Sequence, residues 1–151
     1  MKRGARRRPS PPQDRRARLE RALASDDPLG EVGALVDDGT TLGQVFKYAF
    51  ACILETNSAE LPIVFDRFDD GDLLHIENAL EVIQATKTLE DYRTLKRAFD
   101  AAIASGLDRL DASDVVAGRP ELAMLGRRYK AHVAEMERQL ISFCRAHVGE
   151  L

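Results

Sequence analysis

The sequence predicts an all-α fold, namely a single compact domain of about six helices spanning residues 15–151 behind a disordered basic tail of residues 1–14. Three observations predict it. Apolar side chains recur every three or four residues along most of the chain, no two convincing strands exist to pair, and no repeat of fixed period occurs. With 151 residues, 44% of them hydrophobic, the chain can bury one sizeable core.

The N-terminal segment differs in composition from the rest. Residues 1–18 hold eight basic side chains and one acidic one, whereas the whole chain has a net charge of −3, so the remainder is strongly acidic. Three prolines and few apolar residues stand in this segment, which therefore cannot offset its ordering entropy by burial. We expect residues 1–14 to be disordered and residues 15–24 to form a helix that packs Leu19 and Leu23. Pro28 should end that stretch, because the residue before a proline disfavours helical geometry.

The middle of the chain predicts a buried helix followed by a short one. Residues 41–56 are apolar on more than one face, which is typical of a central helix. Residues 61–68 are ambiguous, because Pro62 suits the first turn of a helix while Ile63-Val64-Phe65 could start a strand. A short helix is the preferred interpretation, since no partner strand is available.

The second half predicts a further series of helices. Helical spacing marks residues 73–83 and 89–103; Thr88 with Asp91 resembles a capping pair, and Gly106 suits a left-handed stop. One or two turns are expected at 111–117, followed by one long amphipathic helix over 121–148. The apolar stripe of that last helix could serve a dimer seam or an intrachain core. We favour the core, because the other helices need a surface to pack against.

One acidic segment resembles a calcium loop. Counted from Asp66, residues suitable for an EF-hand stand at Asp70, Gly71, Asp72 and Glu77, but Phe68 occupies a position that needs an oxygen ligand. The preferred interpretation is a connection in which Gly71 makes the turn and Asp70 or Asp72 caps the next helix. A weak cation site over residues 66–77 stays open.

No catalytic, cofactor or metal site is predicted. Cys144 and His147 are three residues apart, yet no orienting group or oxyanion site accompanies them, and His75 and His132 are isolated. Phosphate-binding loops, nucleophile elbows and zinc-protease motifs do not occur. Two cysteines and no apolar run of membrane-spanning length predict a cytoplasmic protein with free thiols.

Charge offers the other route to function. Carboxylates gather in connecting segments, and those at Asp66, Asp69, Asp70 and Asp72 are the predicted contacts with a basic protein partner. Solubility alone is the simpler explanation of such charges. The alternative partner is nucleic acid, gripped at its phosphates by the basic tail. The arginines concerned are Arg3, Arg6, Arg7, Arg8, Arg15 and Arg16.

Several short runs resemble a widespread bacterial helical family of unknown function, whose best-described type is a DNA-mimic protein. They are Tyr48-Ala49-Phe50, residues 65–72, residues 78–85 and the ending Phe143-Cys144-Arg145-Ala146-His147. This chain departs from the family's Asn-Gly-Gly turn, having Asn57-Ser58-Ala59 instead. The resemblance implies an all-α fold and a regulatory binding role through an acidic surface. It carries over no catalytic residue.

The sequence therefore predicts a non-enzymatic interaction or regulatory module that docks through its acidic loops. A nucleic-acid-associated protein is the alternative, and an enzyme of unrecognised type comes third. The partner's identity and the oligomeric state are left open.

Overall fold

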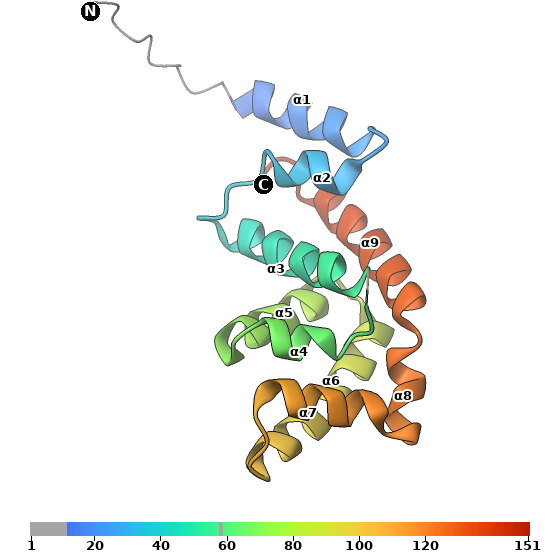
Figure 1. Cartoon of the computed structure of the whole chain (residues 1–151). Helices are drawn as coiled ribbons and strands as arrows, with labels where there is room; N and C mark the ends of the chain where they lie inside the picture. Colours follow the sequence, from blue (N-terminus) through green and yellow to red (C-terminus); the bar gives the residue numbers. More distant parts are fainter. Residues whose placement is uncertain (1–11, 58) are drawn as a thin grey trace, which may run out of the picture.

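The structure of the chain, a computed structural model, describes residues 12–57 and 59–151, and there it consists of nine α-helices without a strand (Figure 1). This confirms the all-α prediction and corrects the number of helices from about six to nine. The helices are α1 Pro12–Leu23, α2 Pro28–Gly33, α3 Thr41–Thr56, α4 Ile63–Arg67, α5 Asp70–Val82, α6 Thr86–Ala104, α7 Arg109–Gly118, α8 Pro120–Gly126 and α9 Tyr129–Ala146.

The start of the chain is helical earlier than expected. α1 begins at Pro12 rather than at residue 15, because proline is compatible with a first helical turn and Asp14 lies where the helix dipole favours an acid. Residues 12–14 therefore belong to a helix and not to a tail. The disorder expected for residues 1–11 lies outside the described residues.

Helix α2 is the first element that the sequence interpretation missed. Pro28 follows α1, as expected, but it also begins α2, and the Asp27 side chain caps this helix by accepting a hydrogen bond from the Gly30 N–H at 3.2 Å. One proline thus marks both the end of one helix and the start of the next.

The long C-terminal helix is divided into two. α8 ends at Gly126, and the chain turns at Arg127 and Arg128 before α9. A Cβ atom at Gly126 would lie 2.9 Å from the Glu60 carboxylate, so the glycine permits a close approach to the loop before α4. The turn lets α8 pack on α6 and α7 while α9 packs on α3. Tertiary packing here overrides an apolar rhythm that continues through the break.

Helix α3 is the central element. It lies between α5 and α9, and Val45, Ala49 and Cys52 on it are buried in the core. α1 and α2 cover one end of the molecule, α7 and α8 cover the other, and α9 runs along the side between them (Figure 1). An aromatic cluster lies in the core beside α4, where the Phe65 ring packs against Tyr92 and Phe99 of α6 at centroid distances of 5.2 and 5.3 Å.

The cap of α6 differs from the predicted one. Thr88 is buried inside the helix and does not form its cap, and Asp91 does not close a capping box. Instead Glu135 of α9 accepts hydrogen bonds from the backbone N–H groups of Thr88 (2.7 Å) and Lys87 (3.4 Å). At the other end Gly106 has φ 104°, so the predicted left-handed stop is confirmed.

Replacing Gly43 with alanine should destabilise the fold by about 1–3 kcal/mol, because its Cβ would collide with the backbone carbonyl of Asp37. The carbonyl cannot yield as a flexible side chain does. Urea unfolding monitored by circular dichroism measures the loss. Gly118→Ala is the matched control: no atom lies within 4 Å of its added Cβ, so that helical position should be unaffected or gain up to about 1 kcal/mol. Equal stabilities of the two variants would contradict the close approach.

Candidate protein-binding surface

The four predicted aspartates surround the beginning of α5. Asp69 is its cap, because its side chain accepts a hydrogen bond from the Asp72 N–H at 2.8 Å. Asp70 and Asp72 lie in the first turn, and Asp66 lies in the preceding helix α4. The expected cap at Asp70 or Asp72 is therefore wrong by one residue, and Gly71 is helical rather than the turn. The cluster forms because the positive end of a helix favours carboxylates.

Arg109, at the start of α7, joins this cluster to a second helix end. Its guanidinium pairs with the Asp70 carboxylate at 2.9 Å and donates hydrogen bonds to the carbonyls of Phe65 and Phe68. The hydroxyl of buried Ser113 adds a bond of 3.0 Å to the Pro62 carbonyl, so α7 is fixed against α4 at two places.

The same contact sets the ionisation of Asp70. The hydrogen bond from Arg109, reinforced by its charge, lowers the pKa of the Asp70 carboxyl below its ordinary value of 3.8. The Asp70 side chain is 83% exposed and remains charged at neutral pH.

Asp72 connects α5 to α3. Its carboxylate accepts a hydrogen bond from the Tyr48 hydroxyl at 3.0 Å, and the Tyr48 ring stacks on His75 at a centroid distance of 4.8 Å. The pKa of Tyr48 is raised mainly by desolvation and, to a smaller extent, by the hydrogen bond to Asp72. The phenol therefore stays protonated and donates this bond. Three of the four predicted contact residues thus also serve the fold, whereas Asp66 makes no ion pair within the described residues.

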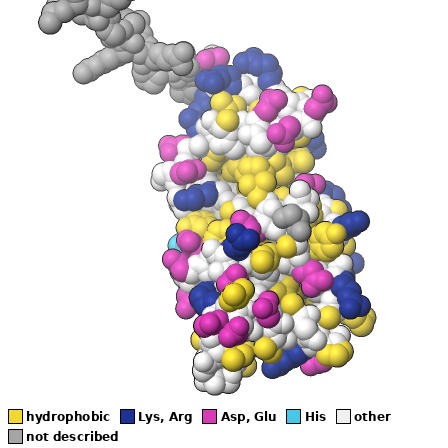
Figure 2. Space-filling model, viewed as in Figure 1, with side chains coloured by type: hydrophobic (Ala, Val, Ile, Leu, Met, Phe, Trp, Pro, Cys, Tyr) yellow, Lys and Arg dark blue, Asp and Glu magenta, His cyan; other side chains and the backbone are white. Residues whose placement is uncertain are grey.

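Helix α7 brings two further carboxylates that the sequence interpretation missed. Asp108 caps α7 by accepting a hydrogen bond from the Asp111 N–H at 2.9 Å, and both side chains are exposed. The Asp-x-x-Asp spacing before a helix was the signal available in the sequence. We define the acidic end by six carboxylates on or beside α4, α5 and α7, namely Asp66, Asp69, Asp70, Asp72, Asp108 and Asp111. Figure 2 shows several acidic side chains in the lower part of the face in view.

The segment 66–77 does not have the geometry of a calcium loop. Residues 70–77 are helical, so their side chains diverge around a helix instead of converging on one point. Among the described residues no group of three or more His, Cys, Asp or Glu side chains is arranged to hold a metal ion.

The predicted phosphate-binding arginines fall into two groups. Arg3, Arg6, Arg7 and Arg8 lie outside the described residues. Arg15 donates to the carbonyls of Leu151 (2.9 Å) and Leu35 (3.1 Å), and so fastens α1 to the end of the chain and to the segment after α2.

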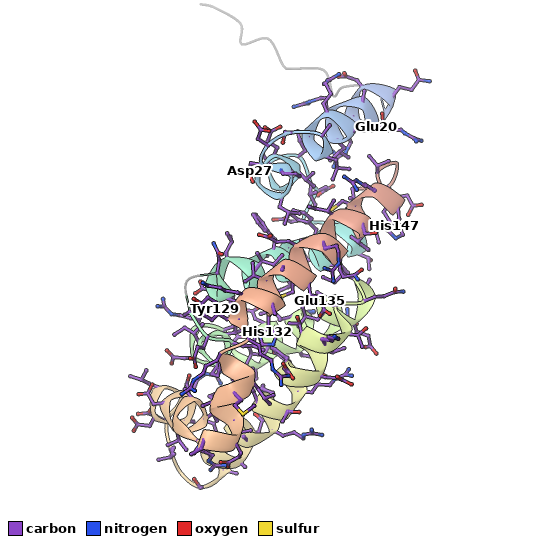
Figure 3. The ribbon with its side chains drawn as sticks, turned by 90° about the vertical axis from the view of Figure 1, so that its right-hand side faces the viewer. Glu20, Asp27, Tyr129, His132, Glu135 and His147 are labelled. Carbon is purple, nitrogen blue, oxygen red and sulfur yellow. The ribbon has the colours of Figure 1, made fainter. Side chains whose placement is uncertain are left out.

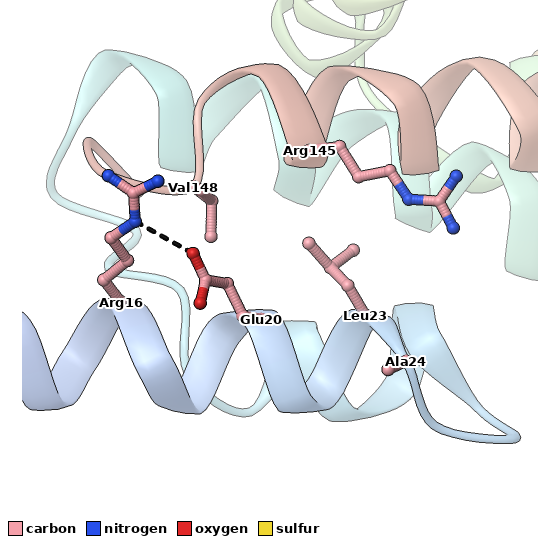
Figure 4. Close-up of a pocket in the computed structure, with 6 residues that line it drawn as sticks. All are labelled: Arg16, Glu20, Leu23, Ala24, Arg145 and Val148. Atoms are coloured by element: carbon pink, nitrogen blue, oxygen red, sulfur yellow. Dashed lines mark hydrogen bonds and ion pairs between the residues drawn. The ribbon is translucent and has the colours of Figure 1, made fainter.

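Arg16 pairs with Glu20 at 2.9 Å on the edge of a groove of about 330 Å³ (Figure 4). There Arg16, Glu20 and Leu23 of α1 face Val148 and Arg145 across the groove. Arg15 and Arg16, the two predicted phosphate-binding arginines that lie within the described residues, therefore have partners within the protein.

The cysteines are not placed for nucleophilic chemistry. Both are buried, and desolvation raises the pKa of Cys52 and of Cys144 to about 12, so each is a neutral thiol at physiological pH. The ring of His147 packs on Phe143 at 4.7 Å and its Nδ1 lies 3.6 Å from Glu150 rather than on the Cys144 thiol. Cys144 and His147 therefore do not form a nucleophile and base pair.

One histidine that looked isolated in the sequence is engaged in a buried pair. His132 of α9 is 3% exposed, and its Nε2 lies 2.8 Å from Oδ2 of Asp91 on α6. The two residues are 41 positions apart, so no local pattern could reveal the contact.

No helix in the described ranges combines the length and apolar character needed to cross a membrane. Comparison of the chain with protein-family models, with curated proteins and with solved structures found no match. The resemblance to the helical DNA-mimic family therefore stays a prediction.

Proposed function

We propose that the protein is a non-enzymatic binding module that docks its acidic end onto a basic protein surface, in the manner of a DNA mimic. The arrangement around Arg109 carries this proposal. By fixing the start of α7 against the loop before α5, Arg109 places the capped ends of two helices side by side, each with its own carboxylates.

Electrostatics favour a basic partner for such a surface. The six carboxylates outnumber the basic side chains beside them, which are Arg67, Lys96 and Arg109. Arg109 is already paired with Asp70, and Lys96 is paired with Asp100. An excess of one charge sign on one end of a molecule accelerates encounter with the opposite sign and orients the approaching partner.

The acidic end also offers an apolar contact. Leu110 follows Arg109 on α7 and is 57% exposed. Interfaces combine a polar rim with a few apolar side chains that lose contact with water, and Leu110 is suited to that role.

The test removes charge while keeping the hydrogen-bond acceptors. Asparagine at positions 66, 69, 70 and 72 can still cap α5 and accept from Tyr48 and Arg109, so the fold should survive. Proteins captured on the immobilised wild-type protein at low salt are purified, and their affinity for both proteins is measured by isothermal titration. We expect the variant to bind at least about tenfold more weakly.

A matched control removes the same number of charges elsewhere. Asp26, Glu31, Asp37 and Asp38 lie on or beside α2 and are exposed, and their amide variant should bind as the wild type does. Unchanged affinity in the first variant, or equal losses in both, would exclude the acidic end as the docking surface.

A truncation separates this proposal from nucleic-acid binding by the basic tail. It should remove residues 2–11 only, because α1 begins at Pro12 and a longer deletion would disturb the core residue Leu19. Docking through the acidic end predicts that the truncated protein keeps its affinity for the captured protein. Loss of salt-dependent binding to DNA upon truncation would support the tail hypothesis instead.

A further inference from the structure

A groove of about 330 Å³ lies between the first turn of α6 and the first half of α9. Its charged side chains come from both helices and from the turn before α9. Figure 3 shows His132 and Glu135 on the side of α9 that faces α6. The groove belongs to a different part of the molecule from the acidic end.

The two carboxylates of the groove are already bound. Oδ2 of Asp91 lies 2.8 Å from Nε2 of His132 and 3.6 Å from Nη1 of Arg128. Glu135 accepts hydrogen bonds from the backbone N–H groups of Lys87 and Thr88. These contacts hold α6 against α9, while both carboxylates keep their negative charge.

Three cations surround the groove, namely Lys87, Arg128 and Arg138. Within the described residues Lys87 and Arg138 form no ion pair, and Arg128 shares one carboxylate oxygen with His132. The three cations exceed the two carboxylates of the groove by one charge. A bound anion would therefore relieve the remaining repulsion among cations on the facing helices.

His132 also lines the groove, but its two ring nitrogens are not open to a ligand. Since Nε2 is bonded to Asp91, the remaining ring nitrogen Nδ1 is buried and has no hydrogen-bond partner among the described residues. A buried nitrogen without a partner is unfavourable by about 1–3 kcal/mol. Less than 1 Å² of Nδ1 is open to solvent, so His132 lines the groove through its other atoms.

We propose that this groove binds a small phosphorylated metabolite. The phosphate lies among Lys87, Arg128 and Arg138, where guanidinium groups can bind its oxygens in pairs. The volume of the groove agrees with a small ligand, since such sites begin at about 300 Å³.

The experiment is a titration of the isotope-labelled full chain with glycerol 3-phosphate at constant ionic strength, followed by backbone amide NMR. We expect saturable shifts concentrated at residues 86–91 and 128–138. The double variant Lys87→Gln, Arg138→Gln should bind at least about tenfold more weakly. Both side chains are exposed, so the variant should fold.

The control changes two arginines of the groove beside α1, Arg16→Gln with Arg145→Gln, and should leave the affinity within about twofold. Non-saturable shifts, shifts spread over all basic surfaces, or equal weakening by both double variants would overturn the proposal. None of these results bears on the acidic end, so the two proposals fail independently.

Discussion

Replacing Phe99 with alanine is expected to lower the free energy of unfolding by about 3–5 kcal/mol, the largest effect of any change considered for this fold. Phe99 is fully buried, and its ring contacts Phe65, which in turn meets the edge of Tyr92. Truncation would leave a cavity where α4, α6 and α7 meet, and the surrounding helices can close it only in part. Urea unfolding at neutral pH measures the loss.

The cation contacts on the Phe99 ring make the effect larger than that of ordinary apolar burial. The guanidinium of Arg109 lies 5.3 Å from the ring centroid and the ammonium of Lys96 lies 5.7 Å from it. Leu110→Ala is the control, because that side chain is 57% exposed and its removal should change stability by less than about 1 kcal/mol. A loss at Phe99 no greater than that at Leu110 would mean that this junction is not the centre of the core.

The second large effect is expected for Arg109→Met, which should lower the free energy of unfolding by about 2 kcal/mol. Methionine keeps the length of the side chain but donates no hydrogen bond to the carbonyls of Phe65 and Phe68. The exposed pair with Asp70 contributes little to this loss, since ion pairs at surfaces are weak. Asp70→Asn, which keeps the carbonyl contacts, should therefore be much milder.

Arg109→Met should also change how the stability of the protein depends on pH in the acid range. Arg109 lowers the pKa of Asp70 in the folded protein, so the contribution of the pair is complete above pH 3.8 and is lost as the pH falls through the lower folded-state value. The small part of the stability difference between wild type and Arg109→Met that comes from the Asp70 pair should accordingly shrink below that pH, while the larger part from the carbonyl contacts should remain. Unfolding midpoints in urea at pH 7 and near pH 3 measure it, and a constant difference would contradict the pairing.

The binding prediction and the stability prediction meet at Arg109. Loss of its contacts removes one of the two hydrogen-bonded links between α7 and α4, so Asp108 and Asp111 would be held less firmly beside Asp70. Arg109→Met should weaken partner binding although it makes the surface more acidic. Tighter binding of this variant would show that charge alone, and not its placement, determines docking.

Local patterns in the sequence predict the helices well where the ends carry their own signals. Both bounds of α3 are predicted correctly, and Thr40 before it accepts a hydrogen bond from the Gly43 N–H. The stop at Gly106 is confirmed for the same reason, since left-handed geometry favours glycine. The break between α8 and α9 is not predictable in this way, because it depends on the approach of Glu60 to Gly126.

In the candidate surfaces, too, the sequence predicts what lies close together in the chain and misses what tertiary contacts bring together. The aspartates before α5 are neighbours in the sequence and can be found by inspection, whereas the addition of Asp108 and Asp111 depends on contacts that Arg109 makes 39 to 44 residues away. The cap supplied by Glu135 and the pair of His132 with Asp91 likewise join α9 to α6 across the fold. Contacts of this kind depend on how distant helices pack together, so no regular spacing of residues in the sequence predicts them.

The most direct measurement of the central claim is the salt dependence of partner affinity for the wild-type protein and for the variant with asparagine at positions 66, 69, 70 and 72. If the acidic end carries the docking charge, wild-type affinity should fall by about tenfold or more between 50 and 300 mM salt, and the variant should lose most of that dependence. Parallel salt dependences in the two proteins would contradict the claim and place the docking charge elsewhere on the molecule.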